Sequence, residues 1–324
     1  MQLQLTLDIP RLPRPIKYTD SILLIGSCFT EHISERLSAH KFQVLSNPHG
    51  ILFNPLSVTH SLDSYLQGLT YSQDDLFLLH ELWNSWDHHT RFSHTSSSQA
   101  LAGINASQVS ASGFIKKADW VIITLGSAFQ YYLVAGARPV ANNHRAPAQW
   151  FEKRLLGIDH ICAAMSNTLE ALFRENAHVN VLFTISPVRH IRDGVVDNNR
   201  SKARLIESVH ELCARYDKAH YFPAYELVMD ILRDYRYFDI DFVHPNYLAT
   251  SYVWEQFVKA CIHNDTALLM QQVHDIAAAR NHRPRFPETQ AHQKFRDVYV
   301  QKIKGLQQSH PFLDLNNELQ YFLE

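Results

Sequence analysis

The sequence has few cysteines and no long apolar run. Of the four cysteines among 324 residues, Cys162, Cys213 and Cys261 lie in apolar helical patterns, and no CxxC spacing occurs. We therefore expect neither a disulfide framework nor a zinc site, and we expect the reducing cytoplasm as the compartment. The longest apolar runs, residues 21–26 and 120–125, are much shorter than the roughly 20 residues of a membrane-spanning helix, so no membrane span is predicted.

The sequence also lacks an excess of charge of either sign. It has 30 Lys and Arg against 32 Asp and Glu, a formal net charge of −2. Since nothing favours binding to phosphates, nucleic acid is not predicted as a partner. The 20 histidines contain no HxH or HExxH spacing, so we predict no metal and no cofactor.

Short apolar runs alternate with helical patterns over most of the chain. This order predicts an α/β protein with a parallel sheet covered on both faces. The expected strands are residues 21–25, 43–45, 119–125 and 179–185. The expected helices that follow or separate them are residues 29–41, 154–174, 203–216 and 247–261.

The pattern changes beyond residue 264. Two amphipathic helical stretches, 267–280 and 291–308, are joined by the Pro-rich segment 283–287. We predict a main domain over residues 1–263 and a helical appendage over residues 264–324 that packs on it.

The turn Gly26-Ser27-Cys28 is the first candidate for chemistry. It joins a strand to a helix, and in open parallel sheets ligands bind beyond the carboxyl ends of the strands. A helix N-terminus favours a thiolate or a developing oxyanion, so Ser27 or Cys28 is a candidate nucleophile. The alternative is that Ser27 only caps the helix and Cys28 fills space.

A second candidate is the pair Asp241 and His244, three residues apart in a polar stretch. Asp241 can accept a hydrogen bond from Nδ1 of His244 and leave Nε2 to take a proton from a nucleophile. We expect this pair to face the Gly26–Cys28 turn. A bare DxxH also occurs by chance, and the alternative is a solvated loop pair.

Several ordered blocks resemble the GSCFA family, whose members resemble the SGNH/GDSL esterases. The blocks are residues 26–30, 47–55, 82–89, 124–128, 142–145, 186–190, 221–226, 241–245 and 283–284. The resemblance implies a three-layer, flavodoxin-like SGNH hydrolase fold. It also implies a Ser-His-Asp site with a late DxxH motif, which Asp241 and His244 match.

The same resemblance aligns the esterase Gly-Asp-Ser with Gly26-Ser27-Cys28, so the nucleophile falls on Cys28. We expect Cys28 rather than Ser27, with a thiol pKa lowered by the helix N-terminus and a histidine. For the oxyanion hole, Gly50 matches the esterase Gly after the second strand. Ala128 stands where the family of esterases has Asn, so Ser127, Asn142 or Gln130 would have to replace that donor.

Further polar residues follow the expected strands and are candidates for contact with the substrate. They are His88, His89, Asn142, His144, Arg189 and His190. Arg189 could hold a carboxylate or phosphate. The alternative for all of them is a hydrogen-bonded structural network.

The sequence thus predicts a hydrolase or acyltransferase that attacks an ester or thioester. The expected substrate is a small-molecule or carbohydrate acyl compound, and the acyl group passes to water or to a sugar hydroxyl. The alternative is a non-catalytic ligand-binding protein that retains the esterase fold.

Overall fold

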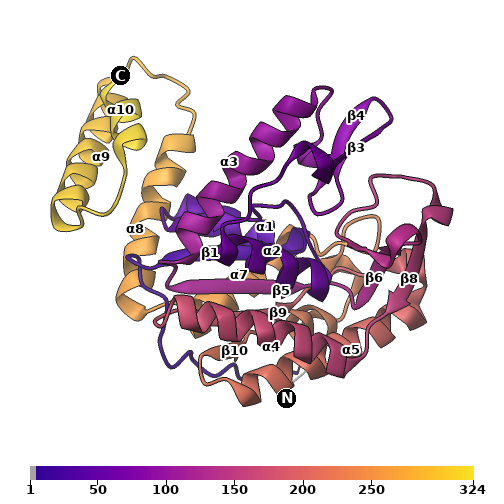
Figure 1. The fold of residues 1–324 in the computed structure, drawn as a ribbon. Helices are drawn as coiled ribbons and strands as arrows, with labels where there is room; N and C mark the ends of the chain where they lie inside the picture. Colours follow the sequence, from indigo (N-terminus) through magenta and orange to yellow (C-terminus); the bar gives the residue numbers. More distant parts are fainter. Residues whose placement is uncertain (1–4) are drawn as a thin grey trace.

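Five parallel strands form the centre of the computed structural model, which describes residues 5–324 (Figure 1). Their order, β2-β1-β5-β9-β10, is the flavodoxin-like order 2-1-3-4-5. The strands are β1 (Ser21–Gly26), β2 (Gln43–Ser46), β5 (Trp120–Leu125), β9 (Asn180–Ile185) and β10 (Ala219–Tyr221). The α/β prediction is confirmed. Residues 1–4 of the predicted first domain lie outside the described residues.

Helices cover both faces of this sheet because alternate strand residues point to opposite sides. Leu24 and Ile122 belong to a core shared with one set of helices, and Leu23 and Ile123 to a core shared with the other. The first set is α1 (Cys28–Ala39), α6 (Ala224–Glu226) with the π-turns of Leu227–Leu232, and α7 (Tyr247–Cys261). The second set is α2 (Pro55–Gln67), α3 (Ser97–Ile115), α4 (Ile158–Glu175) and α5 (Val195–Arg215).

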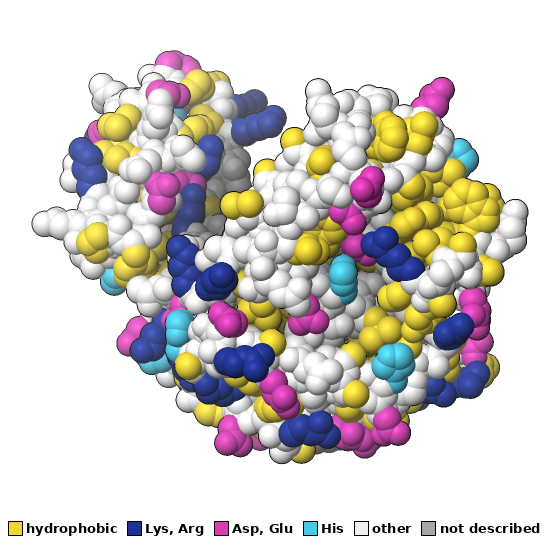
Figure 2. Space-filling model, viewed as in Figure 1, with side chains coloured by type: hydrophobic (Ala, Val, Ile, Leu, Met, Phe, Trp, Pro, Cys, Tyr) yellow, Lys and Arg dark blue, Asp and Glu magenta, His cyan; other side chains and the backbone are white. Residues whose placement is uncertain are grey.

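Two small antiparallel units are inserted into this pattern, and the sequence did not predict them. They are the hairpin of β3 (Leu76–Leu79) and β4 (Leu82–Ser85), and the sheet of β6 (Phe129–Leu133), β7 (Pro139–Val140) and β8 (Phe151–Leu155). The helix expected over residues 154–174 is therefore wrong at its start, because residues 154 and 155 pair with β6 as the end of β8. Figure 2 shows hydrophobic side chains gathered on the right, over the region of these units. In this part of the chain Leu78, Leu82 and Trp150 are exposed.

The C-terminal part is helical. It consists of α8 (Asn264–Asn281), α9 (Gln290–Ser309) and α10 (Asn316–Leu323), which form the lobe at the left of Figure 1. Buried Leu269 and Val273 of α8 belong to the same core as Phe257 of α7. Lys41 pairs with the buried Glu318 at 2.8 Å, which links this lobe to the end of α1.

Candidate active site

The turn from β1 into α1 is built around Gly26. Its φ is +149°, and a Cβ there would lie 2.3 Å from the carbonyl oxygen of Thr124 on the neighbouring strand, so only glycine fits. Ser27 is the N-cap of α1, and its Oγ accepts a hydrogen bond from the NH of Phe29 at 3.3 Å. Ser27 therefore has the capping role, and Cys28 is the first residue of the helix.

Cys28 is half-buried at this helix N-terminus. Burial raises the pKa of its thiol, and the charge of Glu31 also raises it. The NH groups of Phe29 and Cys28 and the amine of Lys202 lower this pKa, but each has a smaller effect than burial. The expectation of a lowered thiol pKa is thus wrong for the protein without substrate, because desolvation of the thiolate outweighs the helix terminus.

The segment that follows β2 ties the ends of β1 and β5 together. Asn47 accepts a hydrogen bond from the NH of Gly26 at 2.9 Å through Oδ1. The carbonyl of Phe53 accepts hydrogen bonds from the NH groups of Gly126 at 2.7 Å and Ser127 at 3.0 Å. These bonds fix the two turns against each other at the carboxyl edge of the sheet.

The residues Gly50 and Ser127, predicted as donors to an oxyanion, have backbone NH groups that are hydrogen-bonded within the protein. The NH of Gly50 donates to the Asn47 carbonyl at 2.7 Å, and a Cβ on Gly50 would lie 2.1 Å from Cβ of His89. The NH of Ser127 is occupied by Phe53, and its hydroxyl lies 3.3 Å from the Ser201 hydroxyl. In this geometry Gly50 and Ser127 are structural, and the NH of Cys28 is the remaining backbone candidate.

The other two candidate donors lie in a neighbouring loop and strand. Asn142 accepts a hydrogen bond from the NH of His144 through Oδ1 at 2.8 Å. The amide of Gln130 donates to the carbonyls of Tyr131 and Val140, both at 2.8 Å. Both side chains therefore stabilise the β6–β7 region.

His190 lies against the turn. A Cβ placed on Gly126 would lie 3.3 Å from Nε2 of His190 and 3.5 Å from Cβ of Ser27. The imidazole and Ser27 therefore flank the same glycine. Burial, with a smaller contribution from the charge of Lys202, lowers the pKa of His190 to about 4. The ring is therefore neutral at pH 7 and can accept a proton or a hydrogen bond.

Lys202 is a buried amine that the sequence analysis missed. It lies on α5, and its Nζ donates to the carbonyls of Gly126 and Ser186, each at 2.6 Å. These are the first residues beyond β5 and β9. Burial lowers the pKa of Lys202 to about 7. Lys202 lies at helical spacing with Asn198, Ser201 and Leu205 on the buried face of α5. This spacing was the sequence signal that could have predicted its burial.

Asp241 and His244 form the predicted pair. Oδ2 of Asp241 lies 2.6 Å from Nδ1 of His244, and its Oδ1 accepts the NH groups of Val243 and His244 at 2.9 and 3.0 Å. The hydrogen bond from His244 lowers the pKa of Asp241 to about 2. Both side chains are about half exposed. Within residues 5–324, neither of them hydrogen-bonds to Ser27 or Cys28.

Arg189 supports the loop that carries this pair. Its backbone NH donates to the Val243 carbonyl and its Nη1 to the Phe242 carbonyl, both at 3.3 Å. The guanidinium also lies 4.4 Å from the centre of the Phe238 ring. These contacts position the loop, and the assignment of Arg189 to an anionic group of the substrate stays a prediction.

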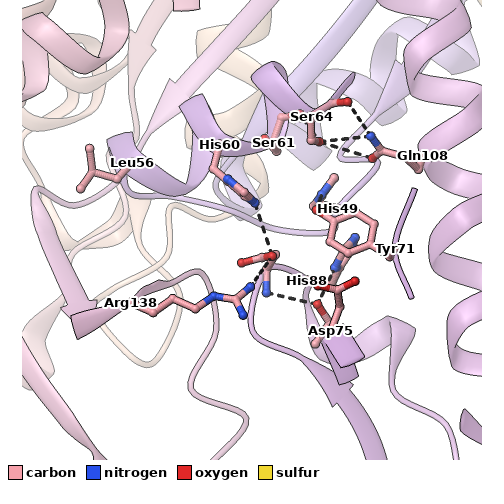
Figure 3. Close-up of polar contacts among 12 residues, drawn as sticks. His49, Leu56, His60, Ser61, Ser64, Tyr71, Asp75, His88, Gln108 and Arg138 are labelled. Atoms are coloured by element: carbon pink, nitrogen blue, oxygen red, sulfur yellow. Dashed lines mark hydrogen bonds and ion pairs between the residues drawn. The ribbon is translucent and has the colours of Figure 1, made fainter. Parts of the chain in front are cut away.

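Of the remaining predicted contact residues, His88 lies in a separate polar network with His49 and Tyr71 (Figure 3). His88 bonds to the Ser85 hydroxyl through Nδ1 at 2.9 Å, and its ring stacks on that of buried His49 at 4.0 Å. Nε2 of His144 lies 2.7 Å from the Ser85 carbonyl. Burial lowers the pKa of His88 to about 3. For His88 and His144, the geometry fits the structural alternative.

His89 lies between this network and the site. Its NH donates to the His49 carbonyl at 2.8 Å, and its side chain covers Gly50. The ring is half-buried, and burial lowers its pKa, while the nearby charge of Glu31 raises it. Contact of His89 with a substrate stays a prediction.

No group of three or more His, Cys, Asp or Glu side chains in the described part of the chain is arranged to hold a metal ion. A search of the same residues found no helix with the length and apolar character needed to cross a membrane.

Comparisons with known proteins identify the family. The model of the GSCFA family matches residues 21–257, and that of the GSCFA domain protein C-terminal domain matches residues 273–324. No curated protein matches the chain. Among solved structures, an acetyl xylan esterase (Est2A) from the rumen bacterium Butyrivibrio proteoclasticus matches with a TM-score of 0.36 and 10% sequence identity over 76% of this chain. The match spans 64% of the length of that structure. The chain belongs to the GSCFA family.

Proposed function

We propose that this protein is an acyl hydrolase or acyltransferase of the SGNH type that acts on an ester or thioester. The observation that supports it most is the bonded pair of Asp241 and His244, at 2.6 Å, in the loop before α7. A carboxylate in this position holds the imidazole in the tautomer whose Nε2 can accept a proton. The candidate nucleophile is Cys28.

In the proposed reaction, the sulfur of Cys28 attacks the acyl carbon and its proton passes to Nε2 of His244. The NH of Cys28 donates to the oxygen that becomes negative. The alcohol leaves with the proton from His244, and an acyl thioester remains on Cys28. Water or a sugar hydroxyl then attacks this thioester, and His244 takes the proton of the attacking hydroxyl. The bond between the acyl carbon and the sulfur breaks, the acid or new ester leaves, and His244 returns the proton to the sulfur of Cys28. The raised pKa of the free thiol means that His244 has to assist its deprotonation.

Substrate or a shift of the exposed loop must bring His244 and Cys28 together, since the two side chains are not hydrogen-bonded in the protein alone. Catalytic hydrogen bonds are often longer in free enzymes and shorten when the substrate binds. The pair formed by Ser27 and His190 is the alternative source of a nucleophile and a base, because both flank Gly126.

A second candidate function is non-catalytic ligand binding. It is favoured by the hydrogen bonds that occupy the NH groups of Gly50 and Ser127, which leave the NH of Cys28 as the backbone donor at the site. Loss of one oxyanion donor typically costs about 3 kcal/mol of transition-state stabilisation. For either function we propose the cytoplasm as the compartment, which the four free thiols support.

Labelling and turnover separate these functions. We propose to assay a panel of chromogenic acyl esters, with a fluorophosphonate and iodoacetamide as probes, on the wild type and on Cys28→Ala, Ser27→Ala, His244→Ala and His190→Ala. We expect hydrolysis that falls about 100-fold or more in Cys28→Ala and His244→Ala. We also expect Cys28 to alkylate more slowly in His244→Ala than in the wild type.

Other results would change the assignment. If Ser27→Ala and His190→Ala abolish activity while Cys28→Ala keeps it, the reaction uses Ser27 and His190. If no ester is hydrolysed and neither probe reacts at the turn, the protein is a binding protein and the proposed activity is wrong.

A further inference from the structure

A groove lies between α1 and the start of α7, beside His244. It has a volume of about 550 Å³, within the range of small-molecule sites. One wall is formed by α1 and the other by the chain from Asp239 into α7. The lining residues are His32, Glu35, Arg36, Ala39, Asp239, His244, Pro245, Asn246, Tyr247 and Thr250.

The groove is next to both reacting groups of the proposed function. Cys28 and His32 are four residues apart on α1, so they lie on one side of the helix, one turn apart. His244 is part of the opposite wall. A substrate whose ester lies at Cys28 and His244 therefore has the groove available for the part attached to the ester.

Some polar groups in the groove are already used. Nη2 of Arg36 donates to the Ser251 hydroxyl at 2.8 Å. The side chain of Asn246 caps α7 and donates to the Arg236 carbonyl at 2.8 Å. Other side chains make no hydrogen bond to another residue in the described range 5–324. They are His32, Glu35, Asp239 and Tyr247.

The charges of these side chains limit the classes of ligand that the groove can bind. Two carboxylates, Glu35 and Asp239, oppose an anionic group such as a phosphate. A long acyl chain would remove Glu35, Asp239 and Arg36 from water and offer them no hydrogen bonds in return. Carboxylates that accept hydrogen bonds and an imidazole and phenol that donate them suit hydroxyl groups, which do both. Tyr247 is 76% exposed, and its ring adds an aromatic surface whose centre lies 5.6 Å from the guanidinium of Arg36.

We propose that this groove binds a neutral carbohydrate, as the sugar part of the acyl substrate or as the acceptor. This inference rests on the proposed function for the role of the sugar. Binding of the sugar itself needs only the groove.

Binding of unmodified sugars tests the inference without any chemistry. We propose calorimetric titration of the full chain with neutral tetrasaccharides of glucose, xylose and N-acetylglucosamine. We expect at least one to bind, and Tyr247→Ala and Glu35→Ala each to weaken that binding about fivefold or more. Tyr321→Ala on α10 and Glu175→Ala on α4, exposed residues outside the groove, should bind as the wild type does.

The inference is overturned if no tetrasaccharide binds at about 10 mM. It is also overturned if the groove variants bind as tightly as the control variants. A chain that hydrolyses simple esters but binds no sugar refutes this inference alone. A chain that binds sugar through Tyr247 but hydrolyses no ester refutes the proposed activity alone.

Discussion

Replacement of Lys202 by Met tests whether a nearly neutral amine lies beneath the candidate site. Lys202 is fully buried, and its Nζ holds the carbonyls of Gly126 and Ser186 at 2.6 Å. Methionine has a similar length and no charge. The change therefore removes the titrating group and leaves the packing of α5 largely intact.

The expected effect depends on pH because burial lowers the pKa of Lys202 from 10.5 to about 7. Below pH 7 the amine is protonated in both states, and the full penalty for burying the charge is present. Between pH 7 and 10.5 the unfolded chain binds a proton that the folded chain does not, so the contribution of Lys202 to stability rises with pH. The rise is about 1.4 kcal/mol for each pH unit and about 5 kcal/mol over the whole window.

Urea unfolding of the wild type and of Lys202→Met at several pH values measures this effect. Tyrosines and cysteines also titrate at high pH, but they do so in both proteins and cancel in the difference. We expect the free energy of unfolding of the wild type, relative to the variant, to increase by about 2 kcal/mol between about pH 7 and pH 9. A difference that does not change with pH would mean that Lys202 is a charged ammonium throughout, and the reasoning from burial would be wrong.

Two further substitutions test the pair and the turn. Asp241→Asn should place an amide NH against Nδ1 of His244 and so favour the wrong tautomer of the imidazole. We expect kcat for a chromogenic ester to fall about 1000-fold while the circular dichroism spectrum stays unchanged. Activity within about threefold of that of the exposed control Asp234→Asn would contradict the pairing role. Gly26→Ala should destabilise the fold by about 4 kcal/mol or more in thermal unfolding, because its Cβ would meet Thr124 backbone atoms at 2.3 and 2.8 Å. The control Gly103→Ala, on an exposed part of α3 with no atom within 4 Å, should be stabilised by about 0.5–1 kcal/mol, and an equal effect of the two changes would show that the close approach at Gly26 is relaxed.

Four of the five strands of the central sheet and most of the longer helices could be predicted because their signals are local, whereas β10 was not predicted. Apolar runs located β1, β5 and β9 within one residue, and the period of 3.6 located α7 over the same residues as in the structure. The hairpin β3–β4 and the sheet of β6, β7 and β8 were missed, since these strands are only two to five residues long, and a run as short as Leu76–Leu79 does not distinguish a strand from a turn of helix. The start of the helix expected at residue 154 was wrong because pairing with β6 extends the chain there.

The candidate site likewise has features that the sequence predicts and features that only the tertiary structure shows. The sequence by itself determined the strand-to-helix turn at Gly26–Cys28, the likeness to one family and the pairing of Asp241 with His244, because these features depend on residues close together in the chain. Only the tertiary structure decided that Phe53 occupies the NH of Ser127, that Arg189 holds the loop at Phe242, and that a lysine on α5 is buried. Those contacts join segments 53 to 76 residues apart. A hydrogen bond can occupy a donor from any distance along the chain once packing brings its partner within about 3.3 Å.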